Sequence, residues 1–195
     1  RVQLNDARWS AMRGSLNLQS FSWEAQRGIT TRGSATGLHL EELNNLLDIG
    51  GGDAEQAVKQ NLVVNGDWDI NYSQNATGYL NLQQQGGDVV MSYRQQALGL
   101  NNIQLATRFQ SGRIDNRLTG QTRYGSVDAA VAISQTFGDK ILLAPISGYL
   151  KAQIPDLDAI RNLMPIGMSA KGSLQVDTVV SGSVGEPRLN GTANG

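Results

Sequence analysis

The sequence predicts an all-β protein built as one long antiparallel meander. Two-residue alternation of apolar and polar side chains dominates the 195 residues, and glycine-containing turn signals separate the alternating runs. A short phrase also recurs at 14–18, 78–82, 148–152 and 172–176, each time as a glycine followed by alternating apolar residues. Because residues two apart share one face of a strand, each phrase predicts a strand that begins at its glycine and is apolar on that side. We expect about ten to twelve strands around a narrow apolar interior.

The clearest strand is predicted over residues 62–72. Its even positions are mostly apolar and its odd positions are mostly polar. Asn65-Gly66 is by itself a strong hairpin signal, but the alternation continues through it. We therefore favour one long strand with Gly66 inside it over a turn. The same phase places Trp68 on the interior side, whereas it does not place Trp9 or Trp23.

Further alternating runs predict the rest of the meander. They cover residues 80–82, 103–109, 114–122, 127–133, 146–154 and 168–176. The turn signals between the strands lie at 75–78, 86–88, 110–112, 124–126 and 137–139.

Two segments depart from this alternation and predict short helices. Residues 40–48 have leucines at helical spacing before Gly50, and residues 156–163 lie between Pro155 and Pro165, with Asp156 as the expected N-cap. Each helix is too short to be stable alone in water, so both are expected to pack against the sheet, over an end or an open edge.

The composition excludes several classes of protein. The net charge of −1 and the dispersed arginines argue against a nucleic-acid binder, and no cysteine is present for disulfides or thiolate metal sites. No apolar run approaches the ~18 residues of a membrane-spanning helix. The start at Arg1 and the end at Gly195 suggest a piece of a longer protein, with any anchor or export signal outside it.

The sequence contains no pattern that predicts catalysis. His39 is the single histidine, so a histidine-based triad or a multi-histidine metal site is excluded. Asp67 and Asp69 are expected on the polar face of a strand, and Asp156 and Asp158 are expected to cap a helix. The glycine-rich segments 50–53 and 86–88 lack the lysine of a phosphate-binding loop and are expected to be loops. We expect no enzyme activity, no cofactor and no metal site.

The order of several phrases resembles a known family. The C-terminal third contains ISGYLKAQIPDL at 146–157, a short predicted helix, GSLQVD at 172–177 and VSGSVGEPRLNG at 180–191. Earlier, GDWDI at 66–70 precedes TGYLNL at 77–82 and Gly86-Gly87-Asp88. These phrases resemble the C-terminal region of the TamB family, the inner-membrane-anchored subunits of the translocation and assembly module, within the AsmA-like group of bridge proteins. Residues 89–145 fit that family by strand pattern alone.

The resemblance implies a fold, a location and a function. The implied fold is a β-taco, or half-barrel, in which the meander is bent lengthwise around a hydrophobic groove, here with two short helices. Residues 1–195 would form a single β-rich segment of a much longer periplasmic protein of a Gram-negative bacterium, anchored in the inner membrane outside this chain. The implied function is support of phospholipid transport to the outer membrane and of outer-membrane protein and autotransporter assembly. The implied partners are phospholipid acyl chains, an Omp85-type barrel and unfolded outer-membrane proteins.

The apolar strand faces are the candidate functional surface. The predicted groove-lining residues are Leu62, Val64, Trp68, Ile70, Tyr72, Leu80, Leu82, Leu118, Val131, Ile133, Leu150, Ile154, Leu174 and Val176. Inward glycines are expected to leave room between them, although the same pattern also fits an interior filled by its own side chains. Two other functions stay open: a scaffold or chaperone that pairs its edge strands with unfolded outer-membrane proteins, and an extracellular β-sandwich that binds glycans through tryptophan.

Overall fold

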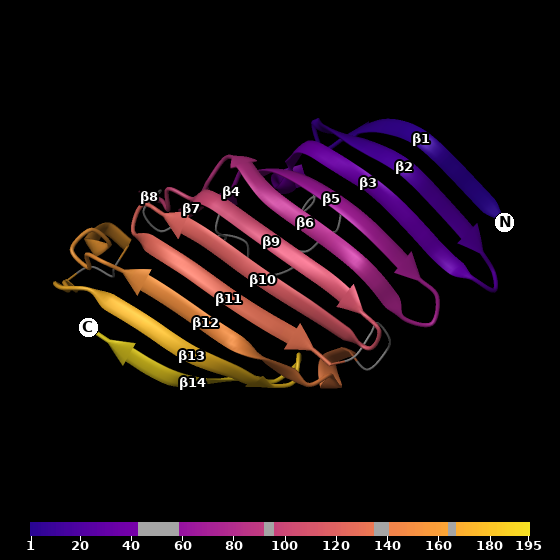
Figure 1. The fold of residues 1–195 in the computed structure, drawn as a ribbon. Helices are drawn as coiled ribbons and strands as arrows, with labels where there is room; N and C mark the ends of the chain where they lie inside the picture. The colour runs from indigo at the N-terminus through magenta and orange to yellow at the C-terminus, as the bar shows by residue number, and fades with distance from the viewer. Residues whose placement is uncertain (43–58, 92–95, 135–140, 164–166) are drawn as a thin grey trace.

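The computed structural model describes residues 1–42, 59–91, 96–134, 141–163 and 167–195 (Figure 1). Its main feature is one antiparallel sheet of eleven strands that follow each other in chain order and do not close into a barrel. The strands are β1 (Val2–Ala11), β2 (Gly14–Glu24), β3 (Gly28–His39), β5 (Val63–Tyr72), β6 (Ala76–Gly86), β9 (Asn101–Gln110), β10 (Arg113–Thr122), β11 (Gly125–Ile133), β12 (Ile146–Ile154), β13 (Leu174–Gly182) and β14 (Pro187–Asn194). The predicted all-β antiparallel meander is therefore confirmed.

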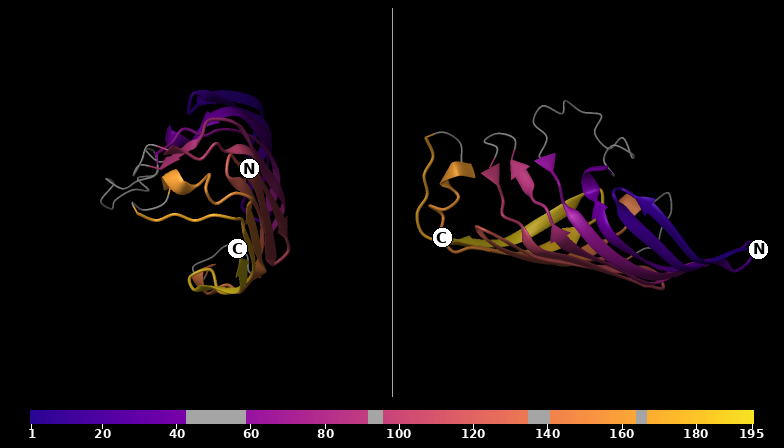
Figure 2. Two further views of the ribbon diagram at one scale, coloured as in Figure 1. Left: turned by 90° about the vertical axis from the view of Figure 1, so that its left-hand side faces the viewer. Right: turned by 90° about the horizontal axis from the view of Figure 1, so that it is seen from above.

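Smaller elements connect these strands. A three-stranded sheet consists of β4 (Lys59–Gln60), β7 (Val89–Met91) and β8 (Gln96–Ala97), and two 3-10 turns are η2 (Ile141–Leu143) and η3 (Arg161–Leu163). Seen along its length, the main sheet follows an open curve, with η2 and η3 on the inner side of that curve (Figure 2).

The strand over 63–72 is continuous, as predicted, and Asn65-Gly66 lies inside it. The register of β3 against β5 shifts between Ala35 and Leu38, and Gly37 in that bulge has a positive φ of 67°. The Asn65 side-chain oxygen accepts a hydrogen bond from the Gly37 backbone N–H at 2.8 Å. Asn65 therefore stabilises a bulge in the neighbouring strand instead of forming a turn.

A second bulge explains why the alternation does not predict which face of the sheet Trp9 and Trp23 lie on. The β2–β3 register shifts between Leu18 and Ser20, so the apolar positions of β2 change from even to odd numbers at Gln19. In β1, Asp6 has a φ of 52°, and pairing with β2 resumes on both sides of it. Because both strands change parity together, the apolar side chains stay on one face.

The helix predictions are corrected in part. Instead of an α-helix over 156–163, only Arg161–Leu163 is helical, as the 3-10 turn η3. Asp156 does not cap an α-helix; its side-chain oxygen accepts a hydrogen bond from the Asp158 N–H at 2.9 Å. Of the helix predicted over 40–48, residues 40–42 are helical and the remainder lies outside the described residues.

The glycine phrase begins a strand only in β2. Gly78 and Gly148 are each the third residue of their strands, and Gly172 lies before β13, so residues 168–173 are not part of that strand. A side chain at Gly78 would overlap the backbone of Asp69, and one at Gly148 would overlap the backbone of Ala130. These two glycines allow two neighbouring strands to approach closely.

The predicted turn signals at 75–78, 86–88, 110–112 and 124–126 lie at strand ends, and the signal at 137–139 lies outside the described residues. The 86–88 segment also has a structural role. The Asp88 carboxylate accepts hydrogen bonds from the backbone N–H groups of Val89, Gly99 and Leu100 at 2.7, 2.8 and 3.0 Å. These bonds join the small sheet to the start of β9.

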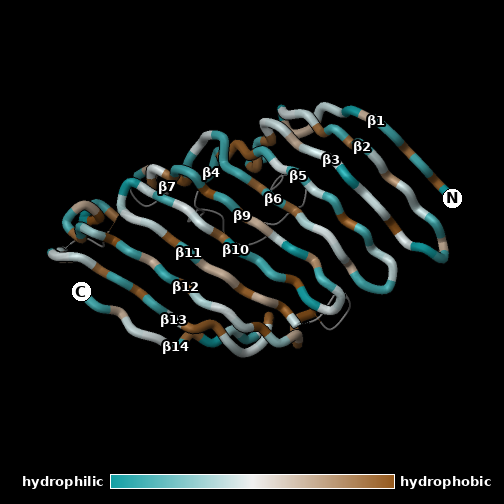
Figure 3. Tube along the Cα trace, viewed as in Figure 1, coloured by the Kyte–Doolittle hydropathy of each residue, from teal (hydrophilic) through white to brown (hydrophobic). Residues whose placement is uncertain are grey.

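One face of the main sheet is polar and is crossed by ion pairs. Arg117 is bonded to Asp128 at 3.1 Å, and Lys151 to Asp177 at 3.4 Å. The hydrogen bond and charge of Asp128 raise the pKa of Arg117 above its usual value. Figure 3 shows the alternation of polar and apolar residues along the strands.

Candidate functional site

The opposite face of the sheet is mostly apolar and extends across all eleven strands. Residues paired directly across neighbouring strands share a face, so the register defines rows that cross the sheet. One row is Trp9, Leu16, Ala35, Gly66, Leu82, Leu105, Leu118, Ala129, Leu150, Thr178 and Gly191. The next is Ala7, Leu18, Gly33, Trp68, Leu80, Thr107, Asn116, Val131, Gly148, Val180 and Leu189. We call this surface the apolar face.

The predicted lining residues lie on the apolar face, with Leu62 as the exception. Leu62 precedes β5, and its backbone carbonyl accepts a hydrogen bond from the Leu40 N–H at 2.9 Å. Val64 is buried, whereas Tyr72 and Leu118 are 37% and 38% exposed. The other predicted residues are half-buried. Most of these side chains therefore keep part of their surface accessible.

The apolar face has little covering material. Among the described residues, no large side chain is fully buried. In the described ranges, the one cluster of buried hydrophobic residues consists of Ala35, Leu38 and Val64, at one end of β3 and β5. In most globular domains, the apolar face of a sheet is buried against a second layer of helices or strands. In the described part of the chain, the apolar face has only short segments against it.

Several inward glycines do not leave empty space, contrary to expectation. The Trp68 ring lies over Gly33, and its Nε1–H donates to the Thr31 hydroxyl at 3.1 Å. Leu82 likewise lies over Gly66, and Ile103 lies over Gly120. The interior is therefore filled in part by its own side chains, and Trp68 is packed against the sheet instead of standing free.

Polar side chains interrupt the apolar face at several positions, among them Thr107, Asn116 and Thr178, and these three are bonded to the protein. Thr107 is buried, and its hydroxyl donates to the Asn116 side-chain oxygen at 2.9 Å. The Asn116 amide nitrogen donates in turn to the Val131 carbonyl at 3.4 Å. Because these polar groups are bonded to the protein, they do not need a polar ligand.

The apolar face at β11 and β12 is the inner face of the curved sheet. Ile160 and Leu163, in and beside η3, line one cavity together with Val127 and Ile154. Because η3 lies on the inner side of the curve (Figure 2), the cavity that these strand residues line with it is also on that side.

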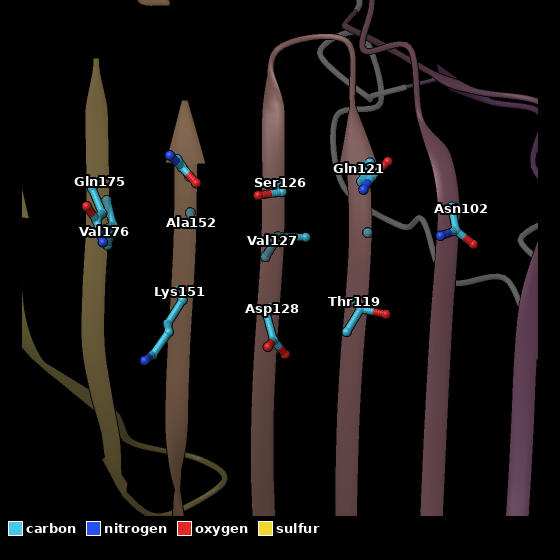
Figure 4. Close-up of a pocket in the computed structure, with 12 residues that line it drawn as sticks. Asn102, Thr119, Gln121, Ser126, Val127, Asp128, Lys151, Ala152, Gln175 and Val176 are labelled. Atoms are coloured by element: carbon cyan, nitrogen blue, oxygen red, sulfur yellow. The ribbon is translucent and has the colours of Figure 1, made fainter. Parts of the chain in front are cut away.

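The hollow on the polar face is shallow and its charged groups are paired. Figure 4 shows Asp128 and Lys151 on neighbouring strands, near Thr119 and Ser126. Asp128 accepts from Arg117 and from the Tyr149 hydroxyl at 3.3 Å, and Lys151 is paired with Asp177. These contacts join neighbouring strands.

The remaining candidate residues from the sequence have structural positions. Asp67 accepts from Asn81 at 3.2 Å, and Asp69 is paired with Arg32, both on the polar face. His39 ends β3, and its backbone N–H donates to the Met12 carbonyl. In the ranges that the structure describes, no three acidic, histidine or cysteine side chains are grouped to hold a metal.

The structure adds residues that sequence phase missed. Trp9, Trp23 and Phe21 belong to the apolar face, but the bulge at Gln19 hides their phase. In the sequence, only Leu16 and Leu18 of the first glycine phrase indicate which face of β2 is apolar, and they do so only for the part of the strand before the bulge.

No protein-family profile matches the chain, and no curated protein and no solved structure is significantly similar to it. Among the described residues, no helix combines the length and the apolar character needed to cross a bilayer.

Proposed function

We propose that this chain is a lipid-conducting segment of a TamB-like bridge protein, in which the inner apolar face of a β-taco shields phospholipid acyl chains. On this proposal the chain lies in the periplasm, is anchored in the inner membrane by a segment outside residues 1–195, and performs no catalysis. It supports phospholipid transport to the outer membrane and outer-membrane protein and autotransporter assembly, with an Omp85-type barrel as partner.

The observation that carries the proposal is the pair of residue rows that cross all eleven strands. Ten spacings of about 4.8 Å make such a sheet roughly 48 Å long. Leu82, Leu105 and Leu118 are consecutive members of one row, and none of them is fully buried. A surface that is both apolar and accessible over that length is unusual for a soluble monomer, and such surfaces commonly bind apolar partners.

The free energy of acyl-chain exposure explains why such a surface is useful. Each exposed methylene costs about 0.8 kcal/mol, so two acyl tails crossing water unshielded cost on the order of 20 kcal/mol. A continuous apolar face removes most of this barrier. The satisfied Thr107–Asn116 pair adds no new polar group that a hydrocarbon chain would have to desolvate.

Site-specific photo-crosslinking tests the proposal with a matched control. Leu118 on the apolar face and Tyr79 on the polar face are each 38% exposed. A photoactivatable residue at position 118 should give phospholipid adducts in cells, detected by mass spectrometry, whereas one at position 79 should not. Equal adduct yields from both positions, or none from position 118, would contradict the proposal.

One observation favours a second function, that of a scaffold for unfolded outer-membrane proteins. Every residue of the edge strand β14 is exposed, and β14 is hydrogen-bonded only to β13 in the described sheet. An unprotected edge of this kind can accept an added strand. Thr192→Pro should abolish strand addition and leave lipid adducts at position 118 unchanged. If Thr192→Pro instead removes the lipid adducts and spares strand addition, the scaffold function is wrong.

A further inference from the structure

A short strap of the chain, residues 155–163, covers the apolar face at the ends of β11 and β12. Local hydrogen bonds shape it: the Arg161 N–H donates to the Asp158 carbonyl at 3.1 Å, and the Leu163 N–H donates to the Ile160 carbonyl at 2.8 Å. The Leu157 N–H also donates to the Gly172 carbonyl at 2.8 Å, which ties the strap to the residues before β13. The strap is therefore held in place by its own backbone.

A cavity of about 280 Å³ lies between the strap and the sheet. The strap contributes Ile160 and Leu163, while Asp158 and Arg161 are exposed. The remaining lining residues are Leu98, Thr122, Tyr124, Gly125, Ser126, Val127, Ala152, Gln153 and Ile154. No charged side chain is among the residues that line this cavity.

The Thr122, Ser126 and Gln153 side chains of the lining are directed elsewhere or already bonded. The Thr122 hydroxyl accepts hydrogen bonds from the N–H groups of Tyr124 and Gly125, each at 3.0 Å, and donates to the Gly125 carbonyl at 3.2 Å. Ser126 and Gln153 are paired positions that belong to the polar face and also line its hollow. The cavity therefore offers a ligand mainly hydrocarbon surface.

The volume limits how much hydrocarbon the cavity holds. A dry apolar cavity of about 150 Å³ is sufficient for one benzene molecule. By the same scale, this cavity accommodates roughly ten carbons of a single chain. Two chains side by side, or a polar headgroup, do not fit its size and lining.

We infer that the cavity between the strap and the sheet binds one unbranched hydrocarbon chain, clamped between Ile160 and Leu163 on one side and Val127 and Ile154 on the other. The inference rests on the proposed function, since acyl chains on the apolar face supply the hydrocarbon. The strap then makes this part of the face a single-chain site, unlike the open face at Leu118.

Methyl-detected NMR on the whole chain tests the site, with decanoate below its critical micelle concentration as the probe. Nuclear Overhauser effects from the decanoate methylenes are expected at the methyl groups of Ile154, Ile160 and Leu163. Effects that are absent there, or that are equally strong at Leu118, would overturn the inference.

A cavity-filling variant provides the matched comparison. Ala152→Leu places three carbons in the cavity and should weaken decanoate binding about 15- to 60-fold, because two or three ligand methylenes are displaced. Ala106→Leu adds the same atoms at an exposed position of the polar face, paired with Arg117, and should leave the affinity unchanged. Equal affinities for the two variants would count against the site. Methyl spectra of both variants report whether the fold is kept.

The two proposals fail in different ways. Lipid adducts at position 118 without decanoate binding at the strap would overturn the single-chain site and support the proposed function. Decanoate binding at the strap without lipid adducts at position 118 would support the site and contradict transport along the face.

Discussion

Gly33 and Trp68 show how single residues set the depth of the inner surface. Trp68 lies flat over Gly33 because that position has no side chain, and its indole N–H is bonded to Thr31. A β-carbon at position 33 would overlap the ring. The glycine therefore makes room for a neighbouring side chain of the same protein, and not for a ligand.

Gly33→Ala should destabilise the protein by about 1–3 kcal/mol, because the new β-carbon would overlap both the Trp68 ring and the backbone carbonyl oxygen of Asn17. Urea unfolding measures this change, and Trp68 fluorescence in a Trp9→Phe, Trp23→Phe background reports the ring. Gly86→Ala is the control, since a β-carbon there would contact nothing within 4 Å. Similar losses in the two variants would show that Trp68 packing is not the cause.

Asp88 gives a second prediction at the same scale. Asp88→Ala leaves three backbone N–H groups without their carboxylate partner, so a loss of about 1–3 kcal/mol in unfolding free energy is expected. Asp177→Asn removes only the exposed pair with Lys151 and should cost less than about 1 kcal/mol. A cost for Asp88→Ala as small as that of Asp177→Asn would contradict the structural role of Asp88.

At the scale of elements, the neighbouring strands β12 and β13 offer one residue on each face of the sheet for comparison. Leu150 lies in the apolar row, paired with Ala129 and Thr178, whereas Val179 is exposed on the polar face of β13. A charge at the first position lies in the proposed lipid path, and a charge at the second does not.

Leu150→Arg should lower the yield of lipid adducts at position 118 roughly tenfold, which corresponds to about 1.4 kcal/mol. Val179→Arg should leave that yield unchanged. Thermal unfolding followed by circular dichroism shows whether either variant is folded. Equal adduct yields in two folded variants would mean that lipid does not pass Leu150.

The sequence predicted the elements whose periodicity is unbroken. Residues 63–72 alternate without interruption, so both the strand and the direction of Trp68 could be predicted. In β2 the bulge at Gln19 reverses the parity, and no local pattern announces it. A helix was predicted over 156–163 from Asp156 as N-cap and from the flanking Pro155 and Pro165, and these signals mark the ends of a helical segment without distinguishing an α-helix from the 3-10 turn that forms.

The candidate site residues could likewise be predicted only where the alternation within a strand is unbroken. The strand register puts those within β5 to β13 on one face of the sheet, whereas Leu62 precedes the strand, which begins one residue later, at Val63. The strap cavity could not be predicted, since it depends on tertiary contacts between Ile160, Leu163 and strands that are distant in sequence.

At the scale of the whole molecule, the thin core predicts ligand-dependent stability. A short-chain phospholipid such as dihexanoyl phosphatidylcholine, below its critical micelle concentration, should raise the free energy of unfolding by about 2.7 kcal/mol at 100 times its dissociation constant. For a chain of this length the melting temperature should rise by roughly 5–10 °C. Differential scanning calorimetry measures the rise, and Leu150→Arg should reduce it. An unchanged melting temperature at saturating lipid would contradict binding to the native sheet.

The uninterrupted strand order gives the sheet the thermodynamics of a one-dimensional array. Each main-sheet strand is hydrogen-bonded only to its immediate neighbours in that sheet, without a crossover. Cooperativity therefore passes from hairpin to hairpin, and opening starts at the two outer strands. Amide exchange should be fastest in β1 and β14 and slowest near β9.

The same strand order makes each hairpin a modular unit. Adding or deleting one hairpin would change the length of the sheet by about 10 Å without redesign of the remaining strands.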